Sequence, residues 1–109
     1  MSRELIIRPE AEADIAQALG WYEARVSGLG SEFLLVLDAA LNSIVKNPSL
    51  YTQVHKHVRR ALTRRFPFAI FFVAEDKRIV VLSVFNVRRN PGVWKNRIQN
   101  FEPVIAADR

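Results

Sequence analysis

Basic side chains that suit phosphate binding crowd the second half of this sequence. Six arginines fall in two groups, one in the middle of the chain and one after a β-branched run: Arg59, Arg60, Arg64, Arg65, Arg88 and Arg89. Guanidinium groups bind phosphate in a fork and keep their charge. Antiparallel pairing would bring the groups together and predicts a phosphate-binding face. The alternative is that these long side chains cover and protect sheet edges.

Two histidines add the possibility of proton transfer. His55 and His57 precede the first arginine group. Histidine exchanges protons near neutral pH. If His57 lies beside Arg65 and Arg88, it can act as a general base or acid while the arginines stabilise a pentavalent phosphate, as a metal-independent ribonuclease requires. A pair of histidines on a strand is also ordinary polar surface, so catalysis stays a hypothesis.

The sequence lacks the residues that several other kinds of catalysis and metal binding need. The chain has no cysteine, which excludes disulfide scaffolds, zinc ribbons and thiol catalysis. No carboxylate accompanies His55 and His57, no serine stands in a nucleophile-elbow context, and no glycine-rich loop joins a strand to a helix. We therefore expect neither a metal nor a cofactor.

Composition indicates one globular domain. The 109 residues are 50% hydrophobic and 25% charged, with a net charge of +5. Residues 1–45 carry three basic and seven acidic side chains, whereas residues 46–97 carry twelve basic ones against Glu75 and Asp76. This asymmetry favours a surface that faces a polyanion. The longest apolar run, Phe66 to Ala74, is too short to cross a membrane, so we expect a cytoplasmic protein.

The periodicity predicts a strand, two helices and further strands. Glu4–Arg8 reads as a strand, and Pro9 opens a helix whose apolar stripe is Ile15, Leu19, Tyr22 and Val26. Gly20 interrupts that helix, which suggests close helix packing there. A second helix carries the apolar positions Phe33, Leu37, Ala40, Leu41 and Ile44 and stops at Asn47-Pro48. The short link between the two helices predicts an antiparallel hairpin.

Three strands are expected after Pro48. Alternation over 54–62 predicts one strand with His55, His57 and Arg59 on one face. Phe66–Glu75 is apolar on both faces and reads as a central strand, and Ile79–Val87 follows a turn at Asp76-Lys77. The fold class is therefore α+β: an N-terminal strand, a helix hairpin on one face, and a three-stranded antiparallel sheet. Residues 1–97 form the domain, and residues 98–109 form a tail.

Six short motifs in order resemble the RelE/ParE toxins of type II toxin–antitoxin modules. They are Trp21-Tyr22, Gly28–Phe33, Asn47–Tyr51, Val58–Arg60, Arg65–Phe68 and Arg88–Trp94. The resemblance covers about Arg3 to Arg97 and implies a growth-arresting bacterial toxin, neutralised by a cognate antitoxin and used in plasmid stabilisation. ParE-like members poison DNA gyrase, whereas RelE-like members cut messenger RNA on the ribosome. The helix hairpin and the Arg65–Phe68 motif look closer to the ParE branch.

The chain departs from the nuclease branch at residues that matter for cleavage. Many relatives have histidine at the place of Asn86 and aspartate at that of Asn90, and a tyrosine that often assists cleavage is replaced by Trp94. Because an amide transfers no proton and an indole has no acidic hydroxyl, these departures favour a gyrase poison. A ribosome-dependent messenger RNA endonuclease remains the alternative, and a plain basic RNA-binding module is the alternative outside the family.

The resemblance and the residue types together assign three sets of residues. If the chain is an endoribonuclease, the catalytic residues are His57, Arg65 and Arg88. Target contact is assigned to Lys56, Arg59, Arg60, Arg64, Arg89 and Trp94. Antitoxin contact is assigned to Trp21, Phe68, Phe71 and Phe101, because an apolar strand beside a basic surface suits an acidic amphipathic segment. Trp21 lies about 100° off the apolar stripe, while Tyr22 on the stripe is expected in the core.

Overall fold

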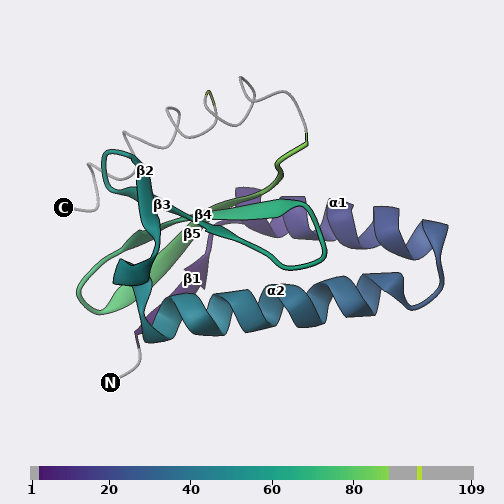
Figure 1. Cartoon of the computed structure of the whole chain (residues 1–109), viewed down its shortest axis with the longest axis horizontal. Helices are drawn as coiled ribbons and strands as arrows, with labels where there is room; N and C mark the ends of the chain where they lie inside the picture. Colours follow the sequence, from purple (N-terminus) through teal and green to yellow (C-terminus); the bar gives the residue numbers. More distant parts are fainter. Residues whose placement is uncertain (1–2, 89–95, 97–109) are drawn as a thin grey trace.

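The helices and strands follow the predicted order, with one strand more than expected after the helices. A computed structural model describes residues 3–88 and residue 96. The elements are β1 (Glu4–Ile7), α1 (Pro9–Arg25), α2 (Leu29–Lys46), the short 3-10 helix η1 (Pro48–Leu50), β2 (Thr52–His55), β3 (Val58–Leu62), β4 (Phe68–Ala74) and β5 (Arg78–Asn86). Figure 1 shows α1 and α2 side by side as an antiparallel hairpin next to the sheet. The α+β class and the helix hairpin are confirmed. The tail predicted for 98–109 lies outside the described residues.

The five strands form one sheet in the order β1-β5-β4-β3-β2. Neighbours from β2 to β5 are antiparallel, while β1 pairs in parallel with β5 at the edge, with Glu4 opposite Arg78. The middle strand is β4, and six of its seven residues are buried. Its apolar character on both faces follows from this central position, as predicted.

The single strand predicted over 54–62 is instead a hairpin. β2 ends at His55, β3 begins at Val58, and Lys56 and His57 form the turn between them. Lys56 has a φ of 50°, in the left-handed region that lysine rarely adopts. Because no glycine, asparagine or proline marks this turn, the alternation continues through it in the sequence. The sheet therefore gains a strand, with His55 at the end of β2 and His57 in the turn.

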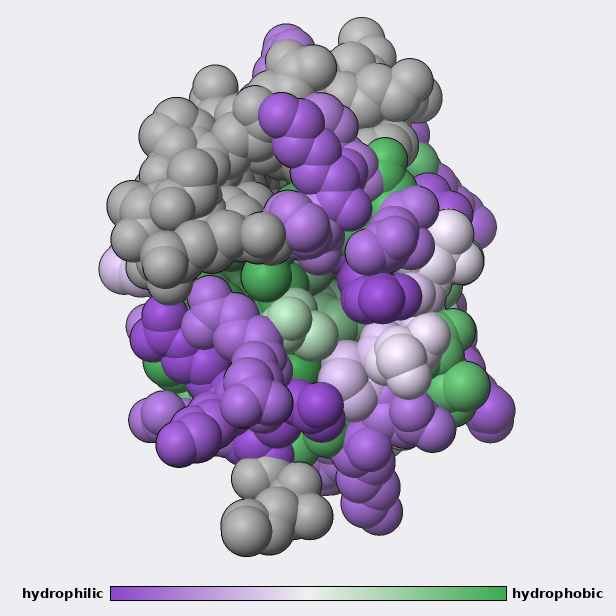
Figure 2. Space-filling view, turned by 90° about the vertical axis from the view of Figure 1, so that its left-hand side faces the viewer, coloured by the Kyte–Doolittle hydropathy of each residue, from purple (hydrophilic) through white to green (hydrophobic). Residues whose placement is uncertain are grey.

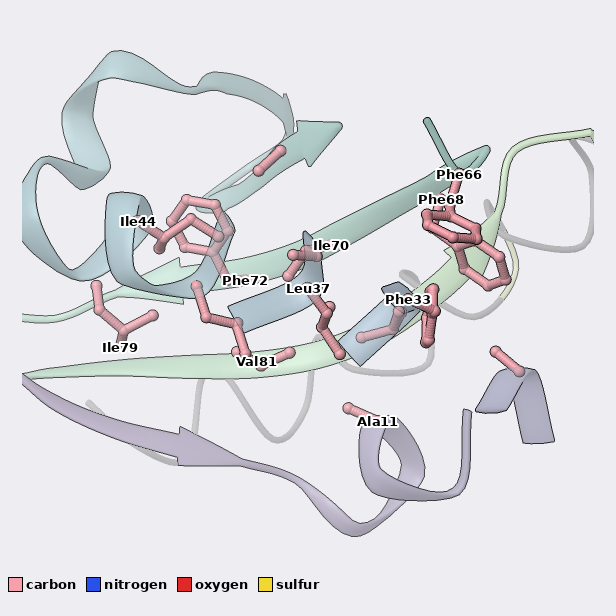
Figure 3. Close-up of a cluster of buried hydrophobic side chains, with 14 of the residues drawn as sticks. Ala11, Phe33, Leu37, Ile44, Phe66, Phe68, Ile70, Phe72, Ile79 and Val81 are labelled. Atoms are coloured by element: carbon pink, nitrogen blue, oxygen red, sulfur yellow. The ribbon is translucent and has the colours of Figure 1, made fainter. Parts of the chain in front are cut away.

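The helix pair covers one face of the sheet. In Figure 3, Phe33 from α2 lies near Phe66 and Phe68 at one end of the apolar cluster, and Ile44 lies with Phe72 and Ile79 at the other. All the predicted α2 positions are buried except the half-buried Ala40. The α2 pattern is therefore confirmed.

The buried face of α1 differs from the predicted stripe. The buried residues are Ala11, Ala18 and Tyr22. Of the predicted stripe, Tyr22 is buried and Ile15 packs half-buried against the core, whereas Val26 follows the end of the helix and is exposed. Alanine side chains are small, so α1 can lie close to the sheet at these positions. A search for large apolar residues overlooks them. Close helix contact also occurs at Gly30 and not at Gly20. A Cβ at Gly30 would lie 2.6 Å from Leu19 Cδ1, but one at Gly20 would meet nothing within 4 Å.

A second apolar cluster occupies the other face of the sheet. Its buried members all come from β3, β4 and β5: Val58, Ala69, Phe71, Val73, Val80, Leu82 and Phe85. Val54 of β2 packs against it. Within the described ranges, neither helix is long and apolar enough to cross a membrane.

Candidate functional site

The turn between β3 and β4 positions two of the predicted arginines. The Thr63 hydroxyl donates to Phe66 O at 2.7 Å, and the Thr63 amide donates to Phe68 O at 3.0 Å. These bonds close a tight loop in which Arg65 has a φ of 67°. Arg64 and Arg65 are thereby held at one end of the sheet, both exposed to solvent.

Arg65 and Arg88 lie at this same end. The β4–β5 register places Phe68 opposite Asn86, and the Val87 amide donates to Pro67 O at 2.8 Å. Arg65 pairs with Glu32 of α2 at 2.8 Å, and its guanidinium lies 5.2 Å from the centre of the Phe66 ring. The antiparallel strands thus bring two arginines that are far apart in sequence to one end of the molecule.

An aromatic cluster lies beneath these arginines. The Tyr22 ring centre is 5.4 Å from that of Phe33, 4.9 Å from that of Phe66 and 6.1 Å from that of Phe68. Burial raises the pKa of the Tyr22 hydroxyl above its usual value, and the positive charge of Arg88 opposes that rise. Tyr22 is a core residue, as predicted, and the charge of Arg88 lowers its pKa.

His57 and Lys56 lie at the opposite end of the sheet. They occupy the β2–β3 turn, and the five-residue strand β3 separates them from Arg64, which at 3.3 Å per residue is a distance of roughly 16 Å. Figure 2 shows the side of the molecule that carries this turn, where hydrophilic residues cover most of the described surface. The structure therefore does not bring His57 together with Arg65 and Arg88.

Arg59 and Arg60 point to opposite faces of the sheet. Arg60 stands opposite Phe71, a member of the strand-only cluster, whereas Arg59 stands opposite Phe72 on the helix side. The Arg59 guanidinium donates to Tyr51 O at 2.6 Å. The described basic residues are therefore divided between two ends and two faces, and the single cationic face expected from their spacing does not form.

A hollow of about 180 Å³ lies between α1 and the strands β4 and β5. Its lining includes Trp21 and Phe68, two of the residues assigned to antitoxin contact. Trp21 is 52% exposed, and the Arg25 guanidinium lies 3.6 Å above its ring. Phe71 is buried in the cluster on the opposite face of the sheet. Arg89, Trp94 and Phe101 lie outside the described residues.

Asp14 lines the same hollow and was not singled out by the sequence. Its Oδ2 accepts hydrogen bonds from the Ser83 hydroxyl at 3.1 Å and from the Val84 amide at 3.0 Å. An acidic residue near the start of a helix is expected to complement the helix dipole, so its spacing gives no sign of a contact with β5. Among residues 3–88 and 96, no group of three or more histidine, aspartate or glutamate side chains is placed to hold a metal ion.

The arrangement defines a class of small α+β proteins in which a helix hairpin packs on one face of a twisted sheet. A solved structure with this arrangement is a chain described as "Chromosomal ParDE TA system from P. aeruginosa". It aligns with a TM-score of 0.69 and 17% identity, over 80% of this chain and 98% of that one. This match confirms the fold that the RelE/ParE resemblance implies. No protein-family model matches the chain, and no curated protein matches it significantly.

Proposed function

We propose that this chain is the toxin of a type II toxin–antitoxin module and that it arrests growth by poisoning DNA gyrase. The observation that carries the proposal is the match to almost the whole of a ParDE chain at a TM-score of 0.69. The ordered sequence motifs support it independently. In this proposal the protein works in the cytoplasm, and a cognate antitoxin expressed with it prevents growth arrest. A plasmid that carries both genes is stabilised because only cells that keep it continue to make the antitoxin.

The separation of the basic residues favours a binding poison over a nuclease. Cleavage of RNA without a metal needs a proton-transfer group beside the groups that stabilise the phosphate. His57 lies at the other end of the sheet from Arg65 and Arg88, and Asn86, nearer to Arg88, transfers no proton. A protein that acts by binding needs no such group.

The end of the sheet formed by the β3–β4 turn and the end of β5 is the proposed contact with gyrase. Arg64, Arg65 and Arg88 are exposed there, and Arg89 and Trp94 follow directly in the sequence. Concentrated positive charge attracts the DNA that gyrase holds, or an acidic surface of the enzyme. Lys56, Arg59 and Arg60 lie away from this end and would contribute to attraction over a longer range.

The hollow beside Trp21 is the proposed contact with the antitoxin. Exposed tryptophan is common among the residues that dominate binding energy, and Phe68 and Phe85 supply apolar walls. An apolar side chain of the antitoxin would fill the hollow. Phe71 would take part only through the opposite face of the sheet.

Controlled expression in a heterologous host tests the proposal. We expect induction to stop growth, to induce the DNA-damage response and to leave transcripts intact, and we expect coexpression of the neighbouring reading frame to restore growth. Cut transcripts that disappear in the Arg65→Ala and Arg88→Ala variants would instead identify an endoribonuclease. Unimpaired growth at high expression would argue against a toxin of either kind.

A further inference from the structure

The strand-only cluster is buried, although neither α1 nor α2 contributes to it. Its described members all lie on the strands β2 to β5, whereas both helices contribute to the cluster on the other face. Phe71 and Leu82 are each 1% exposed, and Ala69 is 0% exposed. A sheet face that met water would leave the tips of such large side chains exposed. A further layer therefore covers this face.

The chain beyond β5 can supply this layer. β5 ends at Asn86, beside the central strand β4, and the sequence continues to residue 109. A helix over residues 91–102 would be roughly 18 Å long. The four strands from β2 to β5, spaced about 4.8 Å apart, are roughly 14 Å across. A helix of this length would therefore reach across the whole strand-only cluster.

The sequence of residues 91–102 has the pattern of an amphipathic helix. Asn90-Pro91 is a typical helix start, because Asn caps a helix and Pro suits its first position. Large apolar residues then recur at spacings of four and three and form one stripe, the C-terminal stripe: Trp94, Ile98 and Phe101. All other residues from Lys95 to Glu102 are polar. Pro103 then ends the pattern, because proline does not continue a helix.

Asn96 agrees with this pattern. It is helical and exposed to solvent. In a helix it lies about 200° around the axis from Trp94, on the side opposite the C-terminal stripe. The polar side of the expected helix is thus the side that meets water.

We propose that residues 91–102 form a helix that lies across the sheet and covers the strand-only cluster with the C-terminal stripe. The molecule then has three layers, with the helix hairpin on one face of the sheet and this helix on the other. The inference does not depend on the proposed function, but it changes three assigned roles. Phe71 and Phe101, assigned to antitoxin contact, pack within the chain, and Trp94 turns from the proposed gyrase contact toward the sheet.

The tether favours this segment over a separate partner. Residues 87–93 link the end of β5 to the stripe. A short link gives the attached segment an effective concentration on the order of millimolar near the sheet. A second copy of the chain, present at a much lower concentration, would have to bind the same face far more tightly. The segment of the same chain is therefore the expected occupant.

Thiol labelling of the full chain tests the proposal, because the sequence has no cysteine. Ile98→Cys places a thiol on the C-terminal stripe, and Asn96→Cys is the matched control on the opposite side. We expect Ile98→Cys to react with a maleimide about tenfold or more slowly than Asn96→Cys, since exposure limits the reactivity of a thiol. The rate for each variant in urea corrects for intrinsic reactivity. Equal corrected rates would overturn the proposal.

Two neighbouring residues of β4 test which face is covered. Phe71 belongs to the strand-only cluster and Phe72 to the cluster under the helix hairpin. In the Ile98→Cys chain, Phe71→Leu should raise the labelling rate about threefold or more, whereas Phe72→Leu should leave it within about twofold. Equal rates in the two folded variants, as verified by thermal melting, would overturn the proposal. The comparison of Ile98→Cys with Asn96→Cys decides it if either variant does not fold.

Dilution separates the tethered helix from a second copy of the chain. Protection of Ile98→Cys by its own chain is independent of protein concentration, whereas protection by a second copy follows mass action. We expect the labelling rate to stay unchanged over about a hundredfold dilution. Protection that disappears on dilution would assign the face to a second copy and overturn the proposal.

Discussion

Two glycines in the helix pair tolerate a side chain differently. Gly20 has open space where a Cβ would stand, whereas a Cβ at Gly30 would lie 2.6 Å from Leu19 Cδ1 and 3.1 Å from Leu19 O. We expect Gly20→Ala to stabilise the protein by about 1 kcal/mol through its helix propensity. Gly30→Ala should stabilise it less than Gly20→Ala does, because the Leu19 side chain must move and the backbone at Leu19 O must give slightly. Urea unfolding measures both, and equal stabilisation by the two substitutions would contradict the close contact.

The raised pKa of Tyr22 predicts how stability depends on pH. Burial raises its pKa above 10.0 in the folded state, so the unfolded state loses this proton first as pH increases. The contribution of Tyr22 to stability is therefore complete below pH 10 and is lost as pH rises through the folded pKa. We expect the alkaline fall in the free energy of unfolding to be smaller in Tyr22→Phe than in the parent. An identical fall in both proteins would show that folding does not raise the pKa of Tyr22.

The position of Arg88 predicts a further shift in the same titration. Its charge lowers the pKa of Tyr22 against the larger effect of burial. The chain has two tyrosines, so Tyr51→Phe leaves Tyr22 as the only one to titrate. In that background Arg88→Gln should raise the pKa of Tyr22, measured by tyrosinate absorbance at alkaline pH, while Lys77→Gln should not. A pKa unchanged by Arg88→Gln would place Arg88 away from the aromatic cluster.

At the scale of the elements, Asp14 ties α1 to β5. It accepts hydrogen bonds from the buried Ser83 hydroxyl and from the Val84 amide, next to the irregularity in the β4–β5 register. Asp14→Ala leaves these two donors without their acceptor and should cost about 1–3 kcal/mol of the free energy of unfolding. The control, Asp38→Ala on the exposed side of α2, should change it by less than about 0.5 kcal/mol. Equal losses of unfolding free energy for the two variants in chemical denaturation would count against the hydrogen bonds of Asp14 to β5.

Helices and strands could be predicted where the apolar pattern agrees with the residues that begin and end an element. Pro9 and Asn47-Pro48 mark helix boundaries, and β4 is apolar on both faces because it is central. The β2–β3 turn could not be predicted, because Lys56 adopts a left-handed conformation without a residue type that signals it. The α1 stripe was wrong at Val26 because the helix ends at Arg25 and Val26 is extended.

At the scale of the whole molecule, the sequence predicted part of the candidate site. Antiparallel strands bring Arg65 and Arg88 to one end, as expected from their places after consecutive strands. The nuclease hypothesis required His57 beside them, but the unpredicted turn places it at the other end.

The central claim is that the chain poisons DNA gyrase by binding. Purified protein incubated with gyrase, relaxed plasmid and ATP, then treated with detergent and protease, tests it directly. We expect linear, gyrase-cleaved DNA that increases with protein concentration, and a clear loss of that product with Arg65→Glu and Arg88→Glu together, because charge reversal repels DNA. Supercoiling that continues normally with no cleaved plasmid, at a protein concentration that arrests growth in cells, would contradict the claim.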